Sequence, residues 1–174
     1  HELLTRCSRV LGTYNAVTLY AQGNLVLTLN QQSKGKEAEP VARQLVAHYE
    51  RHNPPDDYNL FALRIALAQA LRFQNRLTEA VTILRQAIQA CEPVWGFDNQ
   101  NVMTAREILV STFGRLELYA EAEAECALLV KADELRRGSE SAHVVLNRFY
   151  YAQAVFLQEK YEEALELIRR AASD

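Results

Sequence analysis

Four alanines return at a fixed interval along the chain. Ala38, Ala80, Ala122 and Ala164 each lie 42 residues after the one before. A constant period of this size indicates a repeat protein, in which each unit buries its apolar face against its neighbour. An insertion or deletion would break the period, and none has done so across these four positions. The sequence therefore predicts an array of similar units, and we expect the function of such an array to be binding.

Each period is predicted to contain two helices joined by a short turn. In the second period the apolar residues recur with the i, i+3, i+4 spacing of a helix, at Leu60, Leu63, Leu67 and Leu71. A second such stretch starts at Leu77. Two further series keep the 42-residue period: the turn residues Gly12, Pro54, Gly96 and Gly138, and the helix N-cap candidates Asp57, Asn99 and Ser141.

The repeating alanine lies in the second helix of each pair. A small side chain there suits a close helix–helix crossing, because it lets the two backbones approach. We therefore expect Ala122 to be packed at such a crossing, whereas Ala132, further along the same predicted helix, is expected to face solvent.

The predicted fold class is all-α, a right-handed α-solenoid of about four antiparallel helix-turn-helix repeats. The predicted helix pairs are 13–32 with 36–52, 58–74 with 78–91, 102–115 with 120–136, and 142–157 with 162–172. Residues 1–12 are predicted to be the end of a preceding helix, followed by repeats at about 13–54, 55–96, 97–138 and 139–174. We expect residues 1–174 to form one repeat domain and to be a segment of a longer protein.

Composition excludes several classes of function. A net charge of −3 and a pI near 5.9 are unlike a nucleic-acid-binding protein, which needs a basic face. No apolar run approaches the roughly 18 residues that span a bilayer, so no membrane association is predicted. Three cysteines, an odd number without metal-type spacing, indicate reduced thiols and a cytoplasmic protein.

Motifs for catalysis are missing from the sequence. It contains no glycine-rich phosphate loop, no nucleophile elbow and no paired carboxylates in a suitable context, so an enzyme and a cofactor are not expected. His48 and His52 have the four-residue spacing that can chelate a metal. No third ligand has recognisable spacing, so a solvated helix end is the favoured interpretation and no metal site is predicted.

Several short stretches resemble a known family. Residues 36–40 (Lys-Glu-Ala-Glu-Pro), 118–123 (Leu-Tyr-Ala-Glu-Ala-Glu) and 160–165 (Lys-Tyr-Glu-Glu-Ala-Leu) are similar to the start of the second helix in the tetratricopeptide repeat, in the 42-residue form found in kinesin light chains. The first repeat departs from this pattern, with Ser33-Lys34-Gly35 where an aromatic turn residue is expected. The paired asparagines of kinesin light chains are also replaced, so their recognition chemistry does not carry over.

The resemblance implies a scaffold for protein–protein interaction. In the family, first helices line a concave groove, which would hold a peptide or protein segment within a larger signalling or sensor protein. Carried over by repeat position, the candidate groove residues are Asn24, Gln69, Arg72, Phe73, Glu107, Ser111, Arg115, Phe149, Tyr150 and Gln153. The aromatic members either form anchor pockets or fill the core between repeats. The alternative function is an oligomerisation or regulatory arm of an attached effector domain, self-associating through uncapped ends.

Three arginines also follow the period. Arg64, Arg106 and Arg148 could capture carboxylate or phosphate groups through bidentate hydrogen bonds. The alternative is that their stems pack between repeats while their guanidinium groups pair with nearby glutamates. We favour this structural interpretation.

Overall fold

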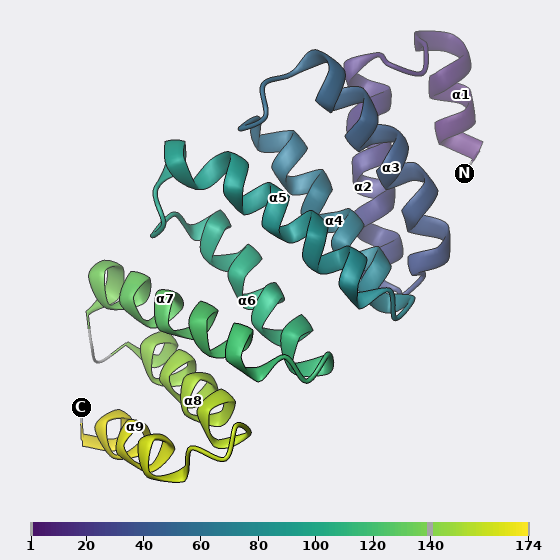
Figure 1. Ribbon diagram of the computed structural model, residues 1–174. Helices are drawn as coiled ribbons and strands as arrows, with labels where there is room; N and C mark the ends of the chain where they lie inside the picture. The colour runs from purple at the N-terminus through teal and green to yellow at the C-terminus, as the bar shows by residue number, and fades with distance from the viewer. Residues whose placement is uncertain (1, 139–140, 174) are drawn as a thin grey trace. The chain divides into compact units, whose positions relative to one another are not determined.

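The computed structural model describes residues 2–138 and 141–173, and these are helical with no strand. In chain order the helices are α1 (Glu2–Leu11), α2 (Ala16–Gln31), α3 (Gly35–His52), α4 (Tyr58–Phe73), α5 (Leu77–Trp95), α6 (Gln100–Arg115), α7 (Tyr119–Arg137), α8 (Ala142–Phe156) and α9 (Tyr161–Ser173) (Figure 1). The all-α prediction is confirmed. Each predicted helix is present, and the largest difference in bounds is at α5, which continues past the predicted end at residue 91.

The chain divides into two compact units, residues 1–87 and 88–174, and helix α5 begins in the first unit and ends in the second. In the first unit, α3 packs against both α2 and α4. In the second unit, α7 packs against α6 and α8, and α9 packs against α8. In each unit a second helix therefore lies against two first helices. The assignment of residues 1–174 to one repeat domain stays a prediction.

All three predicted N-cap residues hold the N-cap position of a helix, and two of them make a capping hydrogen bond. The Asp57 carboxylate accepts a hydrogen bond from the Leu60 amide at 2.9 Å, and the Asn99 side chain accepts one from the Asn101 amide at 2.9 Å. Each bond satisfies one of the amides that the first turn of a helix leaves unpaired. Ser141 also precedes its helix with extended backbone angles, but its side chain makes no capping hydrogen bond.

Every hairpin turn has one residue in the left-handed backbone region. These residues have φ between 57° and 63° and are again 42 positions apart: Ser33, Asn75, Glu117 and Glu159. After Ser33, Asn75 and Glu117, the next amide returns to a carbonyl five residues earlier, as from Arg76 to Leu71 at 3.0 Å. This is the hydrogen-bonding pattern of a Schellman motif, which ends a helix. The sequence did not reveal it, because none of the four residues is a glycine.

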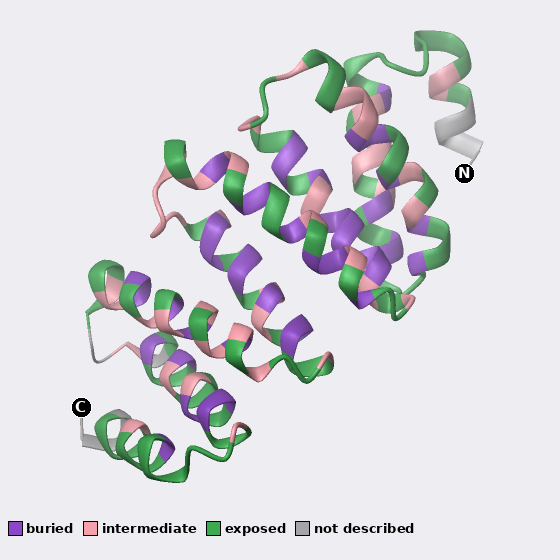
Figure 2. Ribbon diagram, in the orientation of Figure 1, coloured by how far each residue is buried: buried purple, intermediate pink, exposed green. Residues whose placement is uncertain are grey.

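The apolar core follows the predicted helical stripes (Figure 2). Each unit buries large side chains completely, for example Leu45 and Leu71 in the first and Leu109 and Phe113 in the second. The four repeat alanines are all buried, as expected for close helix packing. The most exposed of them, Ala122, has 3% of its surface accessible.

The expectation that Ala132 faces solvent is wrong. Its exposed fraction is 1%, and it packs with Met103 and Leu129 in the second unit. The reason is helical geometry: Ala132 lies three residues after Leu129, so both belong to one apolar stripe of α7.

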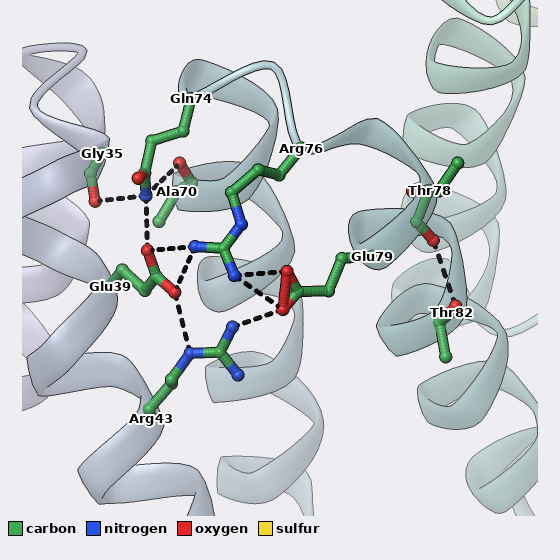
Figure 3. Close-up of polar contacts among 9 residues, drawn as sticks. All are labelled: Gly35, Glu39, Arg43, Ala70, Gln74, Arg76, Thr78, Glu79 and Thr82. Carbon is green, nitrogen blue, oxygen red and sulfur yellow. Dashed lines mark hydrogen bonds and ion pairs between the residues drawn. The ribbon is translucent and has the colours of Figure 1, made fainter.

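A polar cluster ties α3 to α4 in the first unit (Figure 3). The Gln74 side-chain amide donates to the Gly35 carbonyl at 3.2 Å and to the Glu39 carboxylate at 2.7 Å. Arg43 and Arg76 form ion pairs with the same carboxylate, at 2.8 and 2.6 Å. Because the amide and both guanidinium groups converge on Glu39, this one carboxylate holds the hairpin turn of α4 against the start of α3.

The second unit repeats this cluster 84 residues later. The Gln158 side-chain amide donates to the Tyr119 carbonyl at 3.2 Å and to the Glu123 carboxylate at 2.7 Å. Lys160 takes the place of the arginine and lies 2.9 Å from the same carboxylate. The two units therefore use the same contact between a turn glutamine and a second-helix glutamate.

Replacing Glu39 with glutamine is expected to make the first unit less stable at neutral pH but not at low pH. Burial opposes ionisation of Glu39, but hydrogen bonds from Arg43, Gln74 and Arg76 outweigh it and lower its pKa below 4.5. A lowered pKa stabilises the folded chain above the unfolded value, and this contribution is lost as pH falls through the folded pKa. We expect a loss of roughly 1.5 kcal/mol at pH 7.

Urea denaturation between pH 3 and pH 7 measures this difference. The matched control is Glu37→Gln, an exposed carboxylate of the same helix, which should change little at any pH. If Glu39→Gln lowered the free energy of unfolding by the same amount at every pH in this range, the stabilisation could not come from the charge of Glu39.

Candidate functional site

The second unit contains a cavity of about 600 Å³ between the first helices α6 and α8, with α7 beneath it. Its surface is mostly apolar. Helix α7 supplies Ala122, Cys126 and Leu129, which lie deep in the packed core. We refer to this cavity as the α6–α8 cavity.

Four of the ten predicted groove residues come together around this cavity. They are Glu107 and Ser111 from α6, and Tyr150 and Gln153 from α8. The other six do not line it: Asn24, Gln69, Arg72 and Phe73 belong to the first unit, and Arg115 and Phe149 are exposed residues of the second. A binding role for all ten residues stays a prediction.

Sequence reasoning missed several residues of the cavity. Gly114, Tyr119, His143, Asn147 and Leu157 all line it. The carry-over from the family selected only a few positions on each first helix, and Tyr119 begins a second helix. One signal was available: Gly114 is a glycine inside a predicted helix, where it costs about 1 kcal/mol of helix stability relative to alanine.

The cavity has one polar end. Asn147 and Asp133 are buried there, and the Asn147 amide donates to the Asp133 carboxylate at 2.7 Å. Arg137 lies 3.5 Å from the other oxygen of Asp133. The pKa of Glu107, on the facing helix, is raised first by desolvation and then by the charge of Asp133, although His143 and Arg137 oppose the shift. The Glu107 carboxyl therefore ionises less readily than a glutamate in water.

The cysteine beneath the cavity is not a nucleophile. Cys126 is 1% exposed, and burial raises the pKa of its thiol to about 12. The thiolate is the reactive form, and it is not populated near neutral pH at such a pKa. Cys126 therefore acts as a small packing residue.

The three periodic arginines are engaged within the protein. Each pairs with a glutamate fourteen residues earlier: Arg64 with Glu50 at 3.0 Å, Arg106 with Glu92 at 2.5 Å, and Arg148 with Glu134 at 2.8 Å. Their side chains are largely buried, at 12%, 8% and 13% exposed. This confirms the structural interpretation, with buried stems and paired guanidinium groups.

The two histidines of α3 belong to a stack of rings. Tyr14 lies parallel to His48 with ring centroids 4.5 Å apart, and His52 stacks on the other side at 4.4 Å. The Nδ1 of His52 is 2.7 Å from the carbonyl oxygen of His48, so it donates a hydrogen bond. Across residues 2–138 and 141–173, no group of three or more His, Cys, Asp or Glu side chains is placed to hold a metal ion. Within the same ranges, every helix is too short or too polar to cross a lipid bilayer.

Comparison with known proteins agrees with this architecture. Residues 62–99 match the sequence profile of the tetratricopeptide repeat. The nearly identical TPR-like repeats assigned to a kinesin light chain of Podosopora anserina superpose with a TM-score of 0.78 at 19% identity, over 89% of this chain and 74% of theirs. The chain has a tetratricopeptide-repeat fold.

A second tetratricopeptide-like neighbour covers more of the chain. BtubC (BKLC) from P. vanneervenii superposes with a TM-score of 0.75 at 17% identity, over 99% of this chain and 70% of its own. None of the curated proteins matches the chain by sequence. The predicted resemblance to the kinesin-light-chain form of the repeat is confirmed. Tetratricopeptide repeats are a non-catalytic fold type and generally serve as scaffolds for protein–protein interaction.

Proposed function

We propose that this protein is an interaction scaffold that binds a peptide or protein segment in the α6–α8 cavity. The observation that carries the proposal is the cavity itself, about 600 Å³, lined mostly by apolar side chains and polar at one end. Burying the apolar groups of a ligand against such a surface favours binding, while a few polar groups orient the ligand. The proposal involves no catalytic step and no cofactor.

The proposed setting is the cytoplasm, as part of a larger signalling or sensor protein. Support for the compartment comes from the three cysteines, which are all free and form no disulfide. Reduced thiols are the usual state of cysteines in the cytoplasm. Nucleic acid is not a proposed partner, because the net charge of the chain is −3.

Selection of phage-displayed random peptides against the purified chain, followed by NMR titration, tests the proposal. Added peptide should shift the amide signals of α6 and α8, and Gln153→Trp should weaken binding at least tenfold, because the indole occupies the cavity. Leu27 is the matched control: it holds the same repeat position in the first unit and is 49% exposed. The proposal fails if Leu27→Trp blocks binding while Gln153→Trp does not.

The alternative function, self-association, has one observation in its favour. Helix α9 exposes Tyr161, Leu165 and Ile168 at 56%, 42% and 48%. Two periods earlier the equivalent positions hold Leu77, Val81 and Leu84, which are all buried. A second copy packed on this face would cover the exposed side chains. Sedimentation velocity distinguishes the alternatives, because only self-association predicts a mass that rises with protein concentration and falls in Ile168→Glu.

A further inference from the structure

One end of the α6–α8 cavity is open because residue 114 is a glycine. Two periods earlier, in the first unit, the same place is held by Asn30, whose side-chain amide is buried and donates to the Ala66 carbonyl at 2.7 Å. At Gly114, an added Cβ would meet no heavy atom within 4 Å. The cavity therefore reaches the backbone of α6 beside Tyr119 and Leu157, and this end is shaped for a bulky apolar side chain.

The other end presents the Glu107 carboxylate, which lies near His143 and Arg137 but forms no ion pair with a lysine or arginine in the described part of the chain. Glu107 is the acidic residue of the cavity lining, which includes no lysine or arginine among the residues described. The nearby cations are already engaged: Arg106 pairs with Glu92 and Glu125, and Arg137 with Asp133. The charge of Glu107 is therefore available to a cation that enters the cavity.

The two ends are held at a fixed separation by α6. Glu107 and Gly114 are seven residues apart in one helix, which corresponds to about 10 Å at 1.5 Å per residue. A segment in the extended polyproline II conformation has three residues per turn and rises about 3.1 Å per residue, so two side chains three residues apart span about 9 Å on the same face. A helical ligand would need about seven residues to cover the same distance and would be about 10 Å wide with its side chains. The spacing therefore favours an extended ligand.

We propose that the α6–α8 cavity selects an extended segment in which a cationic side chain lies three residues from a bulky apolar one. The cation pairs with Glu107, and the apolar side chain fills the space beside Gly114. This inference rests on the peptide-binding function proposed above and adds the chemistry of the partner.

The affinity of the cavity for a cationic peptide is expected to depend on pH, because the pKa of Glu107 is shifted. Its pKa is raised by desolvation and by Asp133, against the opposing effect of His143 and Arg137. A bound cation favours the ionised form of Glu107, so binding lowers this pKa. Affinity for a cationic peptide should therefore fall as the pH drops through the pKa of Glu107, and Glu107→Gln should remove that part of the dependence.

Synthetic octapeptides with blocked ends test the selectivity directly. The probe carries arginine at position 3 and phenylalanine at position 6 in a glycine–serine background; one comparison peptide has glutamate at position 3, and another has arginine at position 5. Calorimetry should give at least tenfold tighter binding for the probe than for either comparison peptide. Glu107→Gln should remove most of the preference for arginine, whereas Glu162→Gln, an exposed carboxylate outside the cavity, should not.

Filling the cavity tests its apolar end. Gly114→Leu should weaken probe binding at least tenfold while the chain stays folded, because there is open space at this position. Gly23→Leu is the control, since Gly23 lies in α2 and a Cβ there also meets nothing within 4 Å. Thermal melts by circular dichroism verify that both variants fold.

The outcomes separate this inference from the function on which it rests. If peptides shift the amide signals of α6 and α8 but glutamate is preferred to arginine, or Glu107→Gln leaves the preference intact, the inference is overturned and the scaffold function stands. If no peptide binds the α6–α8 cavity at all, both are overturned. Loss of arginine preference in Glu107→Gln together with loss of affinity in Gly114→Leu supports the inference.

Discussion

Replacing Gly35 with alanine is expected to lower the free energy of unfolding by roughly 3 kcal/mol. An added Cβ at this position would lie 2.3 Å from the carbonyl oxygen of Ala70 and 2.9 Å from the Cβ of Phe73. Neither atom is the end of a flexible side chain, so the start of α3 and the last turn of α4 would have to move apart. The movement would also strain the bond from Gln74 to the Gly35 carbonyl.

Gly114→Ala is the matched control for this prediction. Gly114 is also helical, but an added Cβ there meets nothing within 4 Å. Alanine is the better helix former by about 1 kcal/mol, so the control should be neutral or slightly more stable than the unmodified chain. Urea denaturation compares the two variants. Equal stability of Gly35→Ala and Gly114→Ala would contradict the close approach of α3 and α4.

Arg106→Met should destabilise the second unit by about 3 kcal/mol. The Arg106 side chain is 8% exposed, and its guanidinium group pairs with two carboxylates, those of Glu92 and Glu125, whose side chains are 30% and 17% exposed. Methionine keeps the apolar stem but leaves these two negative charges facing each other without their shared cation. Removing one member of a buried ion-pair cluster leaves an uncompensated charge, which lowers the free energy of unfolding.

Arg64→Met provides the comparison at the same repeat position. Arg64 pairs with one carboxylate, Glu50, whose side chain is 46% exposed and can be hydrated when the cation is removed. An exposed pair of this kind contributes less than about 1 kcal/mol. A second variant, Arg106→Met with Glu125→Gln, should recover part of the loss because one of the unpaired charges is gone. Urea denaturation measures the loss of unfolding free energy in each variant. Equal losses for Arg64→Met and Arg106→Met would contradict the role of Glu125 as a second carboxylate.

The positions of the helices could be predicted from the sequence because they depend on local patterns. The 42-residue period, the helical spacing of leucines and the N-cap residues Asp57 and Asn99 all act within a few turns of chain. These features were enough to place the helix pairs. The structural role of Arg106 was also foreseen, because a long apolar stem inside a repeat is most stable when buried.

The departure at Gly35 could be seen in the sequence but not explained there. Leu77, Tyr119 and Tyr161 hold the same place in later repeats, whereas the first repeat has a glycine where the family pattern predicts an aromatic turn residue. In the folded chain the backbone of α4 approaches Gly35 too closely for any side chain. The approach of two helices separated by more than thirty residues is a tertiary property, which the local pattern at residue 35 does not contain.

The candidate site shows the same division between local pattern and tertiary structure. The resemblance to the family, carried over by repeat position, selected Glu107, Ser111, Tyr150 and Gln153, and these four line the α6–α8 cavity. The same carry-over also selected Asn24 and Gln69 in the first unit. In that unit the buried side chain of Asn30 occupies the space that corresponds to the open end of the cavity beside Gly114.

The periodicity and the positions of the helices could be predicted because they follow from the order of residues along one element. The place of the cavity and the pairing of the charged groups could not, because they follow from the packing of different helices against one another. Both depend on the volumes and polar groups that neighbouring helices bring to one place. A single exchange, asparagine at position 30 for glycine at position 114, marks the difference between a filled space and an open one.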